Sequence, residues 1–250
     1  MKKRTVPPRS EGVPEKGDPL YEGKAKRLYL TPDPDLLWME YKDEATAFDG
    51  LKKDVIPGKG ELNTLISAHL FALLEAAGIS THFVRLLGPQ EMLVKRVDIV
   101  PLEVIVRNLA AGSLARRLGL PEGKALLSPV VDFCYKSDEL HDPLVTEDQI
   151  LALGLATPEQ VRALRETALR CNEVLRAYLR TKGLELVDFK LEFGLHRGAL
   201  ILADEISPDT CRFWDVRTGE KLDKDRFRRD LGSLIPAYEE VWKRLQGGEE

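Results

Sequence analysis

The sequence predicts an α+β fold in two lobes, and three observations support this. The chain has 250 residues, which is one large domain or two modest ones at about 100 to 200 residues per domain. Short strand patterns fill the stretch from Leu20 to Val97, where one amphipathic helix interrupts them. After about Ile99 helical patterns dominate. We therefore expect a leader over residues 1–18, a first lobe over residues 19–98 and a second lobe over residues 99–250.

Residues 1–18 differ from the rest of the chain in composition. They hold proline and glycine among charged residues, and such a segment buries too little apolar surface to offset the entropy lost on ordering. Its basic start is typical of an export signal, but proline and charge stand where an apolar segment would be required. We expect no export, and a flexible leader that does not pack on the core.

The first lobe is predicted mainly from strand patterns. Strands are expected over residues 27–30 and 36–41, and a hairpin over residues 83–87 and 92–97. Between them, apolar residues from Leu62 to Ala77 recur at three- and four-residue steps, and a glycine follows. This spacing predicts one main helix with a single buried face.

The second lobe is predicted to contain one well-marked helix, from Pro158 to Lys182. Thr157 begins a capping box, with proline at the first helical position. A second hairpin is expected over residues 184–193 and 199–206, joined by a glycine-bounded turn. Helical segments from Lys224 to Leu245 close the chain.

The composition is that of an ordinary globular protein. Hydrophobic residues make up 43% and charged residues 31% of the chain, so a core can form without disulfide or metal staples. Collagen, wholesale disorder and disulfide scaffolds are excluded. The 37 Lys and Arg against 41 Asp and Glu give a formal net charge of -4, which provides no overall positive field for nucleic acid. We expect no nucleic-acid partner, and any phosphate ligand needs a local cluster of cations.

Cysteine usage and hydropathy bear on the compartment. Cys134, Cys171 and Cys211 are odd in number and far apart, and no C-x-x-C pair occurs. That usage suits a reducing compartment. No stretch approaches the ~18 apolar residues that a membrane-spanning helix needs. We expect a cytoplasmic protein that makes no contact with membranes.

One predicted strand, from Leu186 to Gly194, carries a charged face. Strict alternation places Asp188, Lys190 and Glu192 opposite the apolar side chains. A solvated sheet surface is one interpretation. The hairpin partner strand, however, brings Asp204 close to Glu192, and two adjacent carboxylates repel unless a cation lies between them. Carboxylates completed by phosphate oxygens and water are typical Mg²⁺ ligands in nucleotide enzymes.

A glycine turn near the start of the first lobe is a candidate phosphate flap. Gly23 is followed by Lys24 and Lys26, which share one face if the chain is extended. Such a turn is more often a surface hairpin, but its N–H groups and ammonium charges could cover nucleotide phosphates. Neither a P-loop nor a dinucleotide-binding glycine motif occurs in the chain.

A third cluster follows a buried-looking strand that ends at Arg107. Small residues and then Ser113 come directly after it. The planar guanidinium could bind a carboxylate or phosphate, and the small residues allow close approach of the backbone. A structural salt bridge at the strand end is an equally good interpretation. Hydrolase and zinc sites find less support, because no G-x-S-x-G elbow and no zinc-ligand spacing of histidines occur.

Taken together, these segments closely resemble the SAICAR synthetase family of purine biosynthesis. The resemblance extends from about residue 19 to the C-terminus and leaves the leader without a role. It is carried by Tyr21-Glu22-Gly23-Lys24-Ala25-Lys26, Asp49-Gly50, Lys59-Gly60 with Asn63, Pro101 to Arg107 with Ala111-Gly112-Ser113, His141-Asp142-Pro143, Val187 to Gly194, and Asp204 to Asp209.

The resemblance implies a fold and an activity. The fold is a two-lobed SAICAR synthetase-like α+β fold, with an N-terminal antiparallel β lobe containing one main helix, a larger α+β C-terminal lobe, and an ATP cleft between them. The activity is an ATP-dependent ligation that joins carboxyaminoimidazole ribonucleotide (CAIR) to L-aspartate and gives SAICAR, ADP and phosphate. The implied route has an acyl-phosphate intermediate, and the implied cofactors are ATP as co-substrate and Mg²⁺.

The resemblance also assigns roles to residues of this chain. Asp142 and Lys190 would lie near the reacting groups, and Glu192 and Asp204 would hold Mg²⁺. ATP would contact Gly23, Lys24, Ala25, Lys26, Lys95, Val97 and Ile99, and the imidazole nucleotide would contact Arg107, Ser113 and Arg212. Asp142 is a candidate general base, although an ordinary Asp pKa near ~3.9 makes it a weak one.

Two other classes of protein remain as alternatives. A small-molecule kinase could use the same flap and metal pair without needing aspartate. A catalytically silent nucleotide-binding module would lose the metal carboxylates, yet Glu192 and Asp204 are both present. The kinase is therefore the second interpretation. We also expect a homo-oligomer whose partners are the small-molecule substrates.

Overall fold

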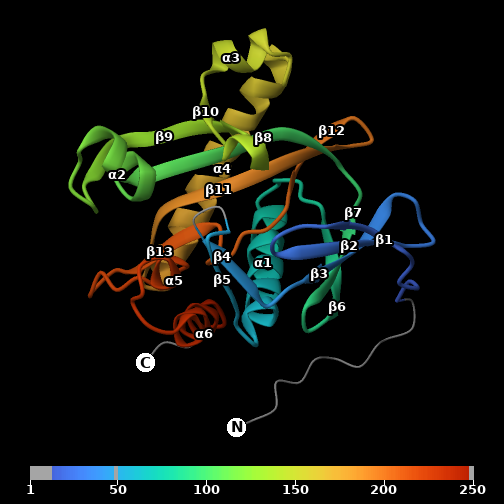
Figure 1. Ribbon diagram of the computed structural model, residues 1–250, viewed down its shortest axis with the longest axis horizontal. Coiled ribbons are helices and arrows are strands. Elements are labelled where there is room, and N and C mark those ends of the chain that lie inside the picture. Colours follow the sequence, from blue (N-terminus) through green and yellow to red (C-terminus); the bar gives the residue numbers. More distant parts are fainter. Residues whose placement is uncertain (1–12, 48–49, 248–250) are drawn as a thin grey trace.

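A computed structural model describes residues 13–47 and 50–247, and its backbone forms two antiparallel sheets around a shared core (Figure 1). The first sheet follows the predicted strands of the first lobe. Its spatial order is β1 (Pro19–Glu22), β2 (Lys26–Leu30), β3 (Leu36–Tyr41), β7 (Glu91–Lys95) and β6 (Phe83–Gly88). A separate hairpin contains β4 (Glu44–Ala47) and β5 (Lys52–Val55).

The second sheet is the centre of the second lobe. It contains, in spatial order, β10 (Leu144–Val145), β9 (Ala125–Tyr135), β8 (Asp98–Leu109), β11 (Leu184–His196) and β12 (Ala199–Ala203), and β13 (Cys211–Asp215) also pairs with β11. Helices still hold slightly more of this lobe than strands do, but the expectation that they dominate after Ile99 left out β9. The pairing of β9 with β8 shifts register between Arg107 and Leu109, and such a shift breaks the alternation on which a sequence-based strand prediction relies.

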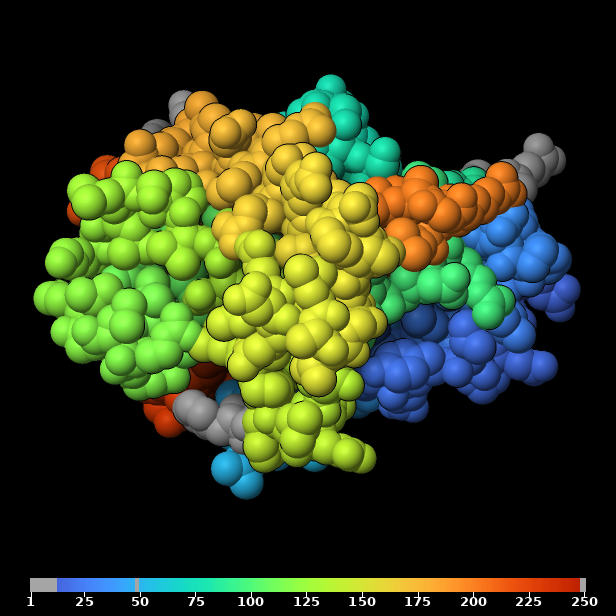
Figure 2. All heavy atoms as spheres, turned by 90° about the horizontal axis from the view of Figure 1, so that it is seen from above, coloured from blue at the N-terminus to red at the C-terminus, as the bar shows by residue number. Residues whose placement is uncertain are grey.

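The helices lie around the sheets and between them. They are α1 (Lys59–Ala76), α2 (Gly112–Leu118), α3 (Glu147–Ala152), α4 (Pro158–Thr181), α5 (Asp225–Arg228), α6 (Leu234–Leu245) and a 3-10 turn η1 (Asp138–Leu140). The predicted capping box of α4 is present, because Thr157 Oγ1 accepts from the Gln160 N–H at 3.2 Å. From above, the yellow segment around α3 lies between the green α2–β9 projection and the blue first lobe (Figure 2).

Helix α1 belongs to both lobes. Its side chains Leu62, Ile66 and Leu70 are fully buried in one apolar cluster with residues of β8, α4 and α6. His69 Nε2 lies 2.6 Å from the hydroxyl oxygen of Tyr178 on α4. The burial follows from the predicted apolar stripe, but the stripe packs on the second lobe as well as the first. The boundary between residues 98 and 99 stays a prediction.

Residues 13–18 differ from the expectation for the leader, because they pack against the first sheet. Val13 contacts an apolar cluster formed by Trp38 and its neighbours. Lys16 Nζ lies 2.6 Å from Glu40 Oε2 and 4.1 Å from the centre of the Tyr29 ring. Desolvation opposes the charge of Lys16, but its two carboxylate partners, Glu40 and Glu91, outweigh this and raise its pKa. Residues 1–12 lie outside the described part of the chain.

We expect Lys16→Ala to lower the free energy of unfolding by about 1 kcal/mol, because it removes partly exposed ion pairs and a cation–π contact. The measurement is urea unfolding at low and high salt, and the loss should shrink with salt. Lys124→Ala, at an exposed position, is the control. An unchanged unfolding midpoint for Lys16→Ala would contradict the packing described for residues 13–18.

Candidate active site

A cleft of about 810 Å³ lies between the two sheets and receives side chains from both lobes. Every residue that the sequence predicted for the site lines it: Gly23, Lys24, Ala25, Lys26, Lys95, Val97, Ile99, Arg107, Ser113, Asp142, Lys190, Glu192, Asp204 and Arg212. These residues come from segments far apart in the sequence. Their convergence is a finding, and their individual roles stay predictions.

The glycine turn between β1 and β2 reaches across the cleft. The Gly23 N–H donates to the Lys26 carbonyl at 2.9 Å and closes the turn. Lys26 forms ion pairs with Asp204 and, at 2.8 Å, with Glu205, both in the second lobe. Lys24 Nζ lies 2.7 Å from Asp138. Both lysines of the predicted flap therefore contact the opposite wall of the cleft.

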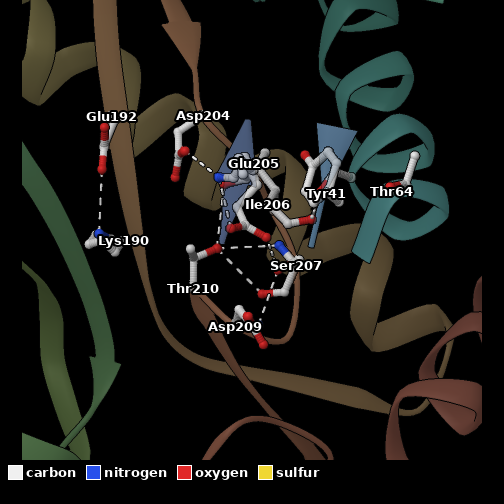
Figure 3. Close-up of polar contacts among 12 residues, drawn as sticks. Tyr41, Thr64, Lys190, Glu192, Asp204, Glu205, Ile206, Ser207, Asp209 and Thr210 are labelled. Carbon is white, nitrogen blue, oxygen red and sulfur yellow. Dashed lines mark hydrogen bonds and ion pairs between the residues drawn. The ribbon is translucent and has the colours of Figure 1, made fainter. Parts of the chain in front are cut away.

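Figure 3 shows Lys190 and Glu192 on one strand, with Asp204 and Glu205 on the neighbouring segment. Ala203 pairs with Glu192 in the register of β11 and β12, so Asp204 follows directly at the end of this hairpin. The predicted proximity is explained by this register. Asp204 takes a left-handed backbone conformation at φ 61°, which ends the strand and turns the chain towards Glu205.

The cations that offset these carboxylates are lysines of the chain itself. Glu192 is ion-paired with Lys136 and lies 3.4 Å from Lys190 Nζ. Burial opposes the ionisation of Asp204, but the charges of Lys26 and Lys190 outweigh it and lower its pKa to about 2. Within residues 13–47 and 50–247, no group of three or more His, Cys, Asp or Glu could hold a metal ion.

Guanidinium and carboxylate groups alternate along the far wall of the cleft. Arg107 donates from Nε to Asp132 at 2.7 Å, from Nη1 to Asp188 at 3.3 Å and from Nη2 to Ser113 Oγ at 3.1 Å. Antiparallel pairing sets Arg107 opposite Asp188 across β8 and β11. Of the two alternatives for Arg107, the salt bridge is present. The guanidinium also lines the cleft, and its role as an anion site stays a prediction.

The alternation continues through Arg212 on β13. Its Nη1 lies 2.8 Å from Asp188 and its Nε 2.9 Å from Asp225, which in turn accepts from Arg228 at 2.7 Å. Gly112 makes room for this guanidinium, because a Cβ there would lie 2.5 Å from Arg212 Nη2. Its φ of +51° also favours glycine. The small residue Gly112 thus makes room for a guanidinium, and the predicted close approach of the backbone to an anion stays a prediction.

A family model described as SAICAR synthetase matches residues 19–245 of this chain. The chain belongs to the SAICAR synthetase family. Two similar proteins, both named phosphoribosylaminoimidazole-succinocarboxamide synthase, come from Coprothermobacter proteolyticus and Persephonella marina. The first is 62% identical over 92% of this chain and 98% of its own length. The second is 56% identical over 93% and 98%.

Solved structures agree with this family membership. The Ehrlichia chaffeensis phosphoribosylaminoimidazole-succinocarboxamide synthase has a TM-score of 0.90 at 44% identity, covering 94% of this chain and all of its own. A SAICAR synthetase in complex with ADP has a TM-score of 0.88 at 52% identity, covering 92% and 98%. The predicted two-lobed α+β fold and family are confirmed. The chain is an enzyme of the SAICAR synthetase family, and the kinase alternative is not favoured.

An apolar wall of the SAICAR synthetase cleft lies where the lobes join. Val97 and Ile99 line it together with Val94. Gly194 permits this approach, since a Cβ there would lie 2.7 Å from Val97. Beside the wall, Lys95 Nζ donates to the Thr81 carbonyl at 2.8 Å. An apolar slot with an ammonium group at its edge suits a planar base that carries phosphates.

Asp142 lies in the turn after η1. His141 and Asp142 both have positive φ, 59° and 48°, a conformation that His and Asp adopt more often than most residues other than glycine. The Ser137 N–H donates to Asp142 Oδ1 at 2.9 Å and fixes the carboxylate at the cleft. On β11, desolvation of Lys190 is outweighed by Glu192 and Glu103, so its pKa is raised and it stays charged.

Several charged residues that line the cleft are not among the predicted site residues. They are Glu103, Lys136, Asp138, Asp188, Glu205, Asp209, Lys224 and Arg228. Lys224 and Arg228 lie in a run of charges around α5, and such a run is usually a solvated face. Asp188 was recognised on the charged face of its strand, but its burial at 3% exposure could not be read from alternation. The Asp49 of the family motif lies outside the described residues.

A buried ion pair lies at the wall of the cleft, which Asp209 also lines. Lys59, at the start of α1, is fully buried and lies 2.8 Å from Asp209 Oδ2. The Tyr238 hydroxyl donates to Asp209 Oδ1 at 2.6 Å, and Lys224 Nζ lies 3.6 Å from Asp209 Oδ2. Burial opposes ionisation of Asp209, but Lys224 and Lys59 hold its pKa far below the usual range. The pair ties α1 and α6 to the turn that carries Asp209.

We expect Asp209→Asn to destabilise the protein by about 3 kcal/mol, because it leaves the buried Lys59 ammonium without its charged partner. Combining it with Lys59→Met should recover part of this loss, since Lys59 is then no longer an unpaired buried charge and only Lys224 still lacks its partner. Chemical unfolding of the wild type, both single variants and the double variant measures the coupling. Strictly additive losses would contradict the proposed dependence of one charge on the other.

Proposed function

We propose that this cleft joins CAIR to L-aspartate at the expense of ATP, giving SAICAR, ADP and phosphate. The observation that supports it most is the convergence of lysines, acids and arginines from both lobes on one cleft. The names of the relatives support the same reaction, and a relative 52% identical to this chain is described in complex with ADP.

The ATP half of the cleft is assigned to the first lobe and to Val97 and Ile99, where the two lobes join. The adenine would lie against Val97 and Ile99, while the turn of Gly23, Lys24, Ala25 and Lys26 would cover the phosphates, with Lys95 beside them. Backbone N–H groups and ammonium charges neutralise phosphate oxygens without chemical participation. Lys26 is ion-paired with Asp204 and Glu205 in the structure. When ATP binds, its ammonium group would leave these carboxylates and contact the phosphates.

The CAIR half is assigned to the arginine-rich wall. Arg107 and Arg212 offer planar donor pairs, and Ser113 adds a hydroxyl group; all three line the cleft. This geometry fits a phosphate better than single ammonium groups would. Because Asp132, Asp188 and Asp225 already hold the guanidiniums in place, little side-chain entropy remains to be lost on binding.

The chemistry requires activation of a carboxylate. The CAIR carboxylate oxygen attacks the γ-phosphorus of ATP, a P–O bond forms, and the bond to the ADP oxygen breaks. The aspartate amine then attacks the carbonyl carbon, phosphate leaves with the C–O bond electrons, and the amine gives up a proton. Phosphoryl transfer depends mainly on positioning and charge neutralisation, which the lysines around Glu192 and Asp204 can provide.

Glu192 and Asp204 would hold the Mg²⁺ that the reaction implies. The donor set fits, because the buried Glu192 and the partly exposed Asp204 both line the cleft, and Mg²⁺ takes one or two carboxylates together with phosphate oxygens. Bound there, the ion would neutralise charge that develops on the transferring phosphoryl group. Lys136 and Lys26 occupy these carboxylates in the structure and would move to the substrates' oxygens.

Asp142 is assigned the proton of the aspartate amine. Lys190 is assigned the positioning of the substrate carboxylate. Lys190 is a cation held by Glu103 and Glu192, suited to orienting an anionic carboxyl group. Asp142 is held by the Ser137 N–H and is the proposed proton acceptor. A carboxylate is a weak base towards an ammonium group, so this transfer follows once C–N bond formation has acidified the nitrogen.

Location and assembly are further parts of this proposal. A cytoplasmic location is supported by Cys134, Cys171 and Cys211, which are buried and unpaired. In the part of the chain that is described, no helix combines the length and hydrophobicity needed to traverse a bilayer. The homo-oligomer stays a prediction.

The deciding experiment measures ADP release by the purified chain with CAIR, L-aspartate and ATP, and with each omitted in turn. The proposal requires ADP and SAICAR in equal amounts, and no sustained ADP release when CAIR is omitted. ADP formation that is independent of L-aspartate, with a phosphorylated product accumulating, would support a kinase instead.

We expect Glu192→Gln and Asp204→Asn to reduce turnover by about 100-fold or more while the fold persists, because a neutral amide is a poorer Mg²⁺ ligand than a carboxylate. The measurement is kcat against Mg²⁺ concentration, together with circular dichroism. Glu166→Gln, on the exposed face of α4, is the matched control. Near-normal rates at limiting Mg²⁺ would exclude this pair as the metal site.

Arg107→Lys should raise the KM for CAIR by about tenfold and leave the KM for ATP within about threefold, because lysine keeps the charge but loses the planar fork. Arg197→Lys, whose side chain is 72% exposed, should change neither. Equal weakening of both substrates would remove Arg107 from the proposed CAIR site.

A further inference from the structure

Asp223 is a buried carboxyl group behind the arginine wall of the cleft. It lies in the turn before α5 and is fully buried. Its Oδ1 accepts from the Asp225 N–H at 2.8 Å. Its Oδ2 is also buried and has no hydrogen-bond partner among the described residues. An unpaired carboxylate oxygen in such a place is costly unless the group carries a proton.

The groups facing Asp223 come from each element around it. Asp225 and Arg228 belong to α5, Arg212 belongs to β13, and the Tyr238 hydroxyl belongs to α6. Asp225 lies between the two arginines, 2.9 Å from Arg212 Nε and 2.7 Å from Arg228 Nη1. Burial opposes its ionisation, yet hydrogen bonds and charge from the arginines lower its pKa to about 2.

The arginine wall carries a formal charge of +1 without Asp223. Its ion-paired members alternate as Arg117, Asp132, Arg107, Asp188, Arg212, Asp225 and Arg228. Four arginines and three aspartates give this sum. An ionised Asp223 would bring the sum to zero, next to Arg212 and Arg228, which line the cleft. A neutral wall binds an anionic ligand less well than a positive one.

The proton affinity of Asp223 agrees with this picture. Burial and the negative charge of Asp225 raise its pKa, and the Asp225 N–H with Arg212 and Arg228 offsets part of the rise, leaving a value of about 7. The group therefore changes charge between about pH 6 and pH 8.

We propose that Asp223 is a positioning residue for the anionic nucleotide. When Asp223 is protonated, Asp225 is the sole counter-charge between Arg212 and Arg228. When Asp223 is ionised, the two arginines bind the ligand more weakly. The inference deepens the proposed function, because the anion it affects is the imidazole nucleotide phosphate. It makes the charge of the wall, rather than its donor geometry, dependent on pH.

The first test compares wild type with Asp223→Asn, which fixes the neutral form at nearly the same size. The KM for CAIR should be equal in both at pH 6 and about fivefold higher in wild type at pH 8.5. The ratio removes the titration of the ligand's own phosphate, which both proteins experience equally. Asp230→Asn, at an 85% exposed side chain after α5, should give a ratio of one to wild type at every pH.

The second test reports on Asp223 without catalysis. A carboxyl whose pKa is raised in the fold binds a proton that the unfolded chain releases, so stability falls as pH rises between about 4 and 7. Wild type should show this fall, and Asp223→Asn should lack it. The melting temperature of the variant should therefore exceed that of wild type by more at pH 8 than at pH 5. Asp223→Ser, also neutral, repeats both tests if the amide does not fold.

The outcomes distinguish the role of Asp223 from the proposed function of the cleft. A constant KM ratio from pH 6 to pH 8.5 would overturn the positioning role, and parallel melting profiles would overturn the protonated carboxyl. If the chain fails to make SAICAR, the proposed function fails. The melting profiles, together with binding of a stable imidazole-4-carboxamide ribonucleotide at both pH values, would still decide the role of Asp223.

Discussion

A cleft with this many charges can exist only if each charge has an opposite neighbour. In its centre Lys26 lies against Asp204 and Glu205, and Lys190 lies against Glu103 and Glu192. Single buried ions would cost several kcal/mol each, whereas closely paired ones recover much of that cost. This requirement explains why the flap contacts the second lobe, and why lysines lie on carboxylates suited to a metal.

The pairing of β8 with β11 gives the cleft its arrangement of charge. The register sets Arg107 opposite Asp188, which attract, and Glu103 opposite Glu192, which repel. Lys190, two residues from Glu192 on the same face, separates the two acids by binding both. A slip of one residue would turn these side chains into the apolar core. The same register that builds the sheet therefore determines which groups can meet a substrate.

Much of the site could be predicted because its motifs are short and local. Alternation placed Asp188, Lys190 and Glu192 on one face, and the hairpin brought Asp204 beside them. Alternation could not reveal that Asp188 on this face is buried, since its partners Arg107 and Arg212 come from other segments of the chain. Lys224 and Arg228 were missed for the same reason. The contacts of residues 13–18 depend on Tyr29 and Trp38 of distant strands, which local composition does not encode.

The position of α1 limits how the enzyme can open. Its apolar side chains lie in one continuous core with β8, α4 and α6, and Lys59 is tied to Asp209. A hinge motion that swung the lobes apart would expose this core and break a buried ion pair, so it lies at the high-energy end of possible motions. The β1–β2 turn, by contrast, crosses the cleft through the ion pairs of Lys24 and Lys26. We therefore expect ligands to enter through a small movement of the β1–β2 hairpin, while the two lobes keep their relative position.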